Sequence, residues 1–74
     1  MKVSIEIGHY YFKVLVEDLP HVCIETKEFK GFHAWSDSET HCSIEWVTRT
    51  NRFTTEYDSM DKWRQILKAL NENL

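Results

Sequence analysis

The sequence predicts an α+β fold in which a four- to five-stranded antiparallel sheet, able to curl into a half-barrel, carries one C-terminal amphipathic helix on one face. From Lys2 to Tyr57, apolar and polar residues alternate in short runs, as they do in strands with one buried face. After Asp58 the apolar residues recur every three or four positions, which is helical spacing. The 74 residues, 42% hydrophobic and 28% charged, indicate one folded domain over residues 1–74, with strands within 2–57 and a helix over about 59–72.

The first expected element is a hairpin. Apolar and polar residues alternate on both sides of Gly8-His9, a dipeptide whose glycine suits the first position of a type II′ turn. A two-residue turn here would place Ile5 opposite Phe12 and gather most apolar residues on one face. Tyr11 and Leu15 fall on the other face, which is therefore not fully polar.

A third strand is expected from Val22 to about Lys27, after a break at Pro20, which lacks a backbone donor. Residues 28–41 are harder to assign, because aromatic residues recur every three positions and an acidic, serine-rich stretch follows. We interpret them as a long acidic connecting loop anchored by Phe32 and Trp35. Loops of this length are more often functional than short ones.

A second hairpin follows this segment. Alternation places Ile44 and Trp46 on one face of a strand and Phe53 on the matching face of the next. A four-residue loop, Arg49-Thr50-Asn51-Arg52, is preferred because it keeps the two arginines from facing each other. This register leaves Glu45 opposite Glu56, which is unfavourable.

The helix is expected to begin after Asp58, whose carboxylate can accept a hydrogen bond from the first free amides, and Asp61 suits the positive end of the helix dipole. Its apolar stripe consists of Met60, Trp63, Ile66, Leu67, Leu70 and Leu74. This stripe is expected to cover the sheet face formed by Val3, Ile5, Phe12, Val14, Ile44, Trp46 and Phe53.

Charge and composition exclude several classes of protein. A net charge of −3 argues against a nucleic-acid partner, since phosphate contacts require clustered Lys and Arg. The alternative is a single-stranded nucleic-acid-binding module in which Arg49 and Arg52 contact phosphates and Trp46 provides a stacking platform. No apolar run approaches the roughly 18 residues of a membrane helix, and two cysteines without an apolar leader favour the cytoplasm.

Histidines and cysteines come closest to a chemical motif. A second alternative is a metal-binding protein that uses some of His21, Cys23, His33, His41 and Cys42. The paired knuckles of structural zinc sites are absent, so no metal and no cofactor is expected. No nucleophile lies in a recognisable presenting turn, and an enzyme is not expected either.

The favoured function is protein binding. Three Trp, three Tyr and four Phe exceed what one thin core needs, and Trp and Tyr are preferred interface anchors. The aromatic and acidic loop with the exposed sheet face would contact another protein, making the chain an inhibitor, immunity-type protein, adaptor or accessory subunit; an open sheet edge would also permit a homodimer. The expected partner-binding residues are Phe32, Trp35, Asp37, Glu39, Tyr11, Arg49 and Arg52.

Overall fold

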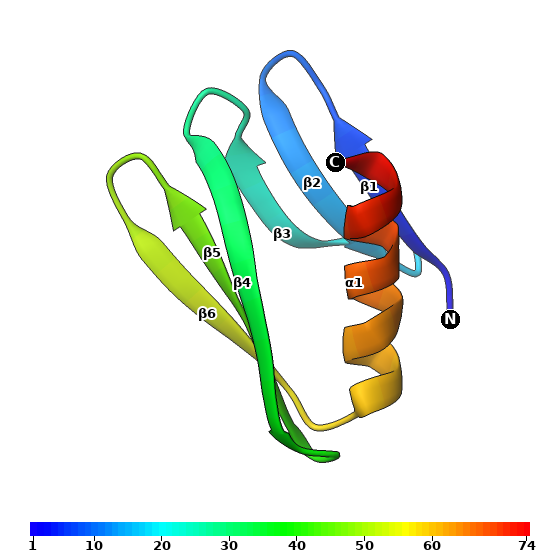
Figure 1. Ribbon diagram of the computed structural model, residues 1–74. Coiled ribbons are helices and arrows are strands. Elements are labelled where there is room, and N and C mark those ends of the chain that lie inside the picture. Colours follow the sequence, from blue (N-terminus) through cyan, green and yellow to red (C-terminus); the bar gives the residue numbers. More distant parts are fainter.

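Six antiparallel strands and one C-terminal helix make up the computed structural model, which describes residues 1–74 (Figure 1). Sheet A has the order β1-β2-β3 and consists of β1 (Val3–Ile7), β2 (Tyr11–Val16) and β3 (Leu19–Glu25). Sheet B has the order β4-β5-β6 and consists of β4 (Phe29–Ser38), β5 (His41–Thr48) and β6 (Arg52–Tyr57). Helix α1 (Met60–Asn73) follows. The α+β class with a C-terminal helix is confirmed, whereas the expected single sheet of four to five strands is replaced by six strands in two sheets.

The largest correction concerns residues 28–41, ten of which form strand β4 and not a loop. The pairing with β5 shifts on either side of Lys30 and of Asp37, so each is the extra residue of a β-bulge. The bulge at Lys30 lets Phe29 and Phe32 both pack against the core although they are three positions apart. This is why regular alternation failed to reveal the strand.

Both long hairpins differ from the expected register by two residues. In the first, Ile5 pairs with Val14 instead of Phe12, and Gly8 N donates to Tyr11 O, so the turn is His9-Tyr10. A two-residue shift keeps every side chain on its face, so the expected faces are retained.

In the second hairpin Thr48 N donates to Asn51 O, which makes Arg49-Thr50 the turn in place of a four-residue loop. Glu45 now pairs with Thr54, and Glu56 pairs with Ser43. The observed register therefore removes the opposition of the two glutamates that the expected register contained.

The core lies between the two sheets and under α1. It consists of Phe12, Val14, Val22, Ile24, Cys42, Ile44, Trp46, Tyr57, Ile66 and Leu70. Phe12 of β2 stacks on Phe29 of β4, with ring centroids 4.2 Å apart, and so joins the sheets. Two expected core residues are exposed: Phe53 (39%), the second residue of β6, and Leu74 (57%), the last residue.

Helix α1 begins one residue later than expected. Its N-cap is Ser59, whose Oγ accepts from Lys62 N at 3.4 Å, so Asp58 lies outside the helix. Trp63 Nε1 donates to Ser43 O at 2.9 Å and ties the helix to β5. At 14 residues, α1 is too short and too polar to span a bilayer.

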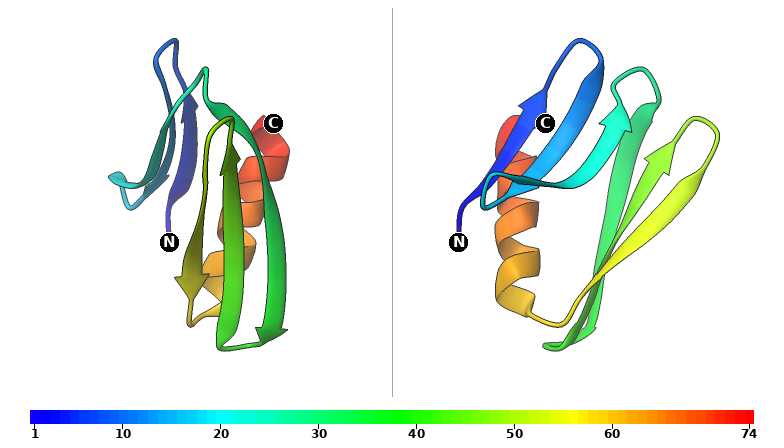
Figure 2. Two further views of the ribbon diagram at one scale, coloured as in Figure 1. Left: turned by 90° about the vertical axis from the view of Figure 1, so that its left-hand side faces the viewer. Right: turned by 180° about the vertical axis from the view of Figure 1, so that it is seen from behind.

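The turns gather at two ends of the molecule, which extends 34 Å along its longest axis. At the tip end, Thr26 N donates to Tyr10 O and Arg49 N donates to Glu28 O, which holds the β1–β2, β3–β4 and β5–β6 turns together. At the base end, Met60 N donates to Glu39 O, which joins the β4–β5 turn to the start of α1. Figure 2 shows the two ends from the side and from behind.

Candidate functional site

The residues expected to bind a partner are divided between the two ends. Tyr11, Arg49 and Arg52 lie at the tip end, whereas Trp35, Asp37 and Glu39 lie toward the base end, on the second half of β4 and the following turn. They therefore form two separate surfaces.

The side chain of Phe32 belongs to neither of these exposed surfaces, and its part in the contact stays a prediction. Its side chain is half-buried against the core, with its ring centroid 6.2 Å from that of Trp46. The bulge at Lys30 turns Phe32 inward, whereas Trp35 points to the opposite face of the sheet.

The base-end residues expected in the contact are all exposed. Trp35, 42% exposed, pairs with Ser43 on the face of sheet B that points away from the core. Asp37 is the bulged residue of β4, and Glu39 lies in the turn whose carbonyl accepts from Met60 N at 3.1 Å. This hydrogen bond ties the β4–β5 turn, which carries Glu39, to the start of α1.

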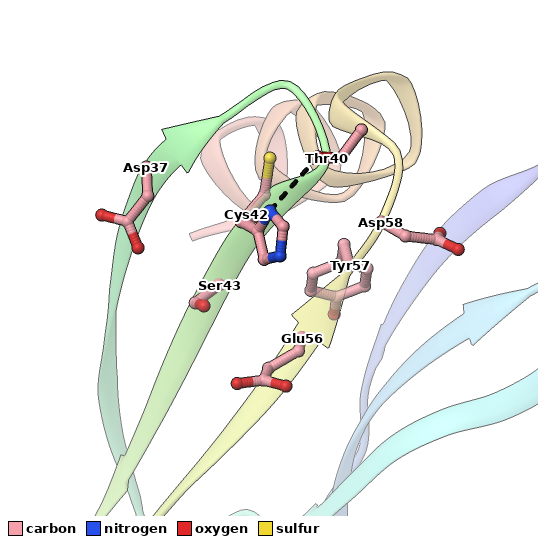
Figure 3. A pocket seen from close by; sticks show the side chains of 8 residues that line it. Asp37, Thr40, Cys42, Ser43, Glu56, Tyr57 and Asp58 are labelled. Atoms are coloured by element: carbon pink, nitrogen blue, oxygen red, sulfur yellow. Dashed lines mark hydrogen bonds between the residues drawn. The ribbon is translucent and has the colours of Figure 1, made fainter.

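A shallow open hollow of about 500 Å³ lies beside these residues (Figure 3). Its lining residues are Asp37, Thr40, His41, Cys42, Ser43, Glu56, Tyr57 and Asp58. The carboxylates of Asp37 and Asp58 point outward on opposite sides in Figure 3, so they do not converge on one point. The hollow presents the carboxylates of Asp37, Glu56 and Asp58 to solvent.

Small polar groups hold the turn beside this hollow. His41 Nδ1 lies 3.2 Å from both Ser38 Oγ and Thr40 Oγ1. The thiol of Cys42 is buried and donates to Ser38 O at 3.4 Å. These hydrogen bonds give His41 and Cys42 a structural role, because they hold the β4–β5 turn.

A hydrogen-bonded chain that the sequence did not reveal connects the core to sheet A. Trp46 Nε1 donates to Thr55 Oγ1 at 3.0 Å, Thr55 Oγ1 lies 2.9 Å from Tyr57 OH, and Tyr57 OH lies 2.7 Å from His21 Nε2. His21 is the bulged residue of β3, which turns its ring toward β6. The pair His21–Tyr57 is the one side-chain hydrogen bond between the two sheets.

Burial lowers the pKa of the His21 imidazole below its ordinary value of 6.5, and the positive charge of Lys62 lowers it further. Burial also raises the pKa of the Tyr57 phenol above 10.0, partly offset by the hydrogen bond from Thr55. Both groups are therefore neutral near pH 7.

The protein is expected to lose stability as the pH falls below 6.5, because the unfolded chain then binds a proton that the folded His21 resists. This contribution is complete above the pKa of the unfolded histidine and is lost as the pH falls through the lower pKa of the folded one. The melting temperatures of the wild type and of His21→Gln, measured between about pH 5 and pH 8, check it. The difference between the two curves isolates His21, and parallel curves would contradict the prediction.

No arrangement of side chains in the structure supports the metal-binding alternative. No group of three or more His, Cys, Asp or Glu side chains is arranged to hold a metal ion. His21 is engaged with Tyr57, Cys23 is exposed on sheet A, and Cys42 is buried in sheet B. Both cysteines are free, so no disulfide joins them.

The tip end carries a basic hollow of about 640 Å³. Arg49 and Arg52 line it, together with Lys30, which the sequence did not place beside them. Trp46 cannot be the stacking platform of a nucleic-acid site, because it is 0% exposed. Phe53, next to Arg52, is an exposed ring at this end, as are Tyr10 and Tyr11 of the first hairpin.

Comparisons with models of protein families, with curated proteins and with solved structures gave no match. The class of the protein is defined by its fold alone. It is a small α+β domain in which two three-stranded antiparallel sheets enclose a core closed by one C-terminal helix.

Proposed function

We propose that this chain is a non-enzymatic protein-binding module that contacts its partner through the outer half of β4 and the β4–β5 turn. The observation that carries the proposal is the position of Trp35, a large aromatic side chain exposed on a strand that pairs on one side only. Such a strand can accept a further strand from another protein, and an exposed tryptophan is a preferred anchor for it.

The charges around Trp35 favour a partner with a basic contact surface. Asp37 and Glu39 follow Trp35 along the chain, and the adjoining hollow adds Glu56 and Asp58. An inhibitor, immunity-type protein, adaptor or accessory subunit fits this surface if its partner presents basic side chains at the contact. Two free cysteines support a cytoplasmic location, where thiols remain reduced.

Affinity capture from the native cell tests the proposal. Trp35→Ala is expected to reduce retention of a specific partner about tenfold or more, as loss of an interface anchor does, and Glu39→Lys is expected to weaken it further. Phe53→Ala is the matched control, because it removes an aromatic side chain of similar exposure at the tip end. Equal retention by Trp35→Ala and the wild type would overturn the proposal.

A second candidate is a single-stranded nucleic-acid-binding module at the tip end. The observation in its favour is the convergence of Lys30, Arg49 and Arg52 on one hollow with exposed Phe53 nearby. This candidate requires salt-dependent binding of a single-stranded oligonucleotide that the double variant Arg49→Ala/Arg52→Ala abolishes. Absence of such binding at low salt would exclude it.

A further inference from the structure

Four strands lie at the margins of the two sheets, and β4 is the one with an unprotected central stretch, which lies between its two bulges at Lys30 and Asp37. Helix α1 packs alongside β1, β3 begins with Leu19-Pro20 and contains a bulge, and β6 carries charged Arg52 and Glu56. Covering elements, proline, bulges and charges are the devices that keep a margin from pairing with another chain. The central part of β4, Gly31–Ser36, has none of them and pairs regularly with β5.

The direction of the free backbone groups of β4 follows from the β5–β6 turn. At that turn Thr48 N donates to Asn51 O, so Thr48 and Asn51 form a hydrogen-bonded pair. Along an antiparallel ladder, hydrogen-bonded and non-hydrogen-bonded pairs alternate. The even-numbered residues of β5 therefore bond to β6, and the odd-numbered residues bond to β4. The β4 partners of those odd-numbered residues are Gly31, His33 and Trp35. The N–H and C=O groups of Phe32, Ala34 and Ser36 therefore point to the open margin of sheet B. This margin is the free side of β4, the green strand at the right-hand edge of sheet B in the left view of Figure 2.

We propose that β4 pairs antiparallel with β4 of a second copy of this chain, around a two-fold axis at Ala34. The inference goes beyond the proposed function, because it assigns a second copy of this chain to the same strand. The two Ala34 residues would exchange N–H···O bonds, and Phe32 of each copy would do so with Ser36 of the other. A small side chain at the axis lets the two strands approach without a clash between identical residues. Sheet B then continues through both copies as one sheet.

In this arrangement the outer face of sheet B in one copy continues into the outer face of sheet B in the other. A two-fold axis perpendicular to the sheet places like faces together, so Trp35 meets His33 of the second copy on the outer face. Both side chains are exposed in the single chain and are free to form this pair. The second copy thus supplies a neighbour for the exposed tryptophan.

Charge complementarity favours a second copy over an unrelated strand. The uncharged stretch of β4 is bounded by Lys30 on one side and Asp37 on the other. Antiparallel pairing at Ala34 brings Lys30 of each copy to the Asp37 end of its partner, twice by symmetry. Arg49 and Arg52 share the hollow of Lys30, and Asp37 lines the acidic hollow, so each basic hollow approaches an acidic one.

Sedimentation equilibrium on the full chain tests the proposal. The wild type is expected to show a concentration-dependent monomer–dimer equilibrium that weakens with salt. Ala34→Pro removes an outward donor without touching the β4–β5 ladder and is expected to give a monomer. Thr54→Pro is the matched control: by the same alternation its N–H points to the open margin of β6, so dimerisation should be unchanged.

A charge exchange keeps the test decisive if a proline variant fails to fold. Lys30→Glu and Asp37→Lys each place like charges together at two symmetric positions, so each alone is expected to dimerise on the order of tenfold more weakly. An equimolar mixture of the two restores opposite charges at both positions and is expected to recover dimers. Failure of the mixture to recover them would overturn the antiparallel arrangement.

The two proposals fail in different ways. A wild-type chain that stays monomeric up to millimolar concentration, while Trp35→Ala still loses a captured protein, overturns the second copy as partner and leaves the proposed function standing. A dimer that Ala34→Pro does not affect overturns the assignment to β4.

Discussion

Replacing Trp46 with alanine is expected to destabilise the protein by roughly 3–5 kcal/mol, the usual cost of truncating a buried aromatic residue. Trp46 is completely buried between Phe12 and Phe32, whose ring centroids lie 6.4 Å and 6.2 Å away. Its loss also removes the donor to Thr55 Oγ1. A chain of this length is stable by roughly 4–11 kcal/mol, so a large part of the population should unfold. Urea denaturation followed by circular dichroism measures the change.

Trp35→Ala is the matched control for that experiment. The same side chain is removed, but from an exposed position on β4, so the free energy of unfolding should change by less than about 1 kcal/mol. Similar losses from the two substitutions would mean that the core is not centred on Trp46.

The second large effect is expected at Leu70. Its side chain is completely buried where α1 closes the core, and Leu70→Ala should cost roughly 2–5 kcal/mol because it leaves a cavity between the helix and the sheets. The midpoint of urea denaturation is the measurement, at an unchanged slope.

Leu74→Ala distinguishes loss of core packing from loss of a leucine near the end of the chain. Leu74 lies four residues further on and is 57% exposed, so its truncation should stay within about 0.5 kcal/mol of the wild type. If Leu70→Ala is equally mild, α1 does not close the core.

Hydrophobic periodicity predicted the faces of the elements well and their pairing less well. Ile5 and Trp46 lie on the expected faces, yet both of their hairpins are shifted by two residues from the expected register. Alternation repeats every two residues, so it cannot distinguish registers that differ by two. The helix depends on local spacing alone, and its observed bounds, Met60–Asn73, differ by one residue from the expected ones.

The candidate site was harder to predict because it depends on bulges and on contacts between distant segments. The extra residue at Lys30 turned Phe32 inward, and nothing in the local composition announced it. The hydrogen bond between His21 and Tyr57 joins residues 36 positions apart and requires both the bulge in β3 and the packing of the two sheets. The roles of Trp35, Asp37 and Glu39 remain predictions that the proposed experiments check.

The one extra residue of the bulge at Lys30 determines which alternate side chains of β4 face the core and which face the solvent. Deleting it while Phe29 kept its place would exchange the two sets, so that Trp35 would face the core and Phe32 the solvent. A single inserted or deleted residue at this bulge would therefore change which side chains β4 exposes to solvent, without changing any other residue of the strand.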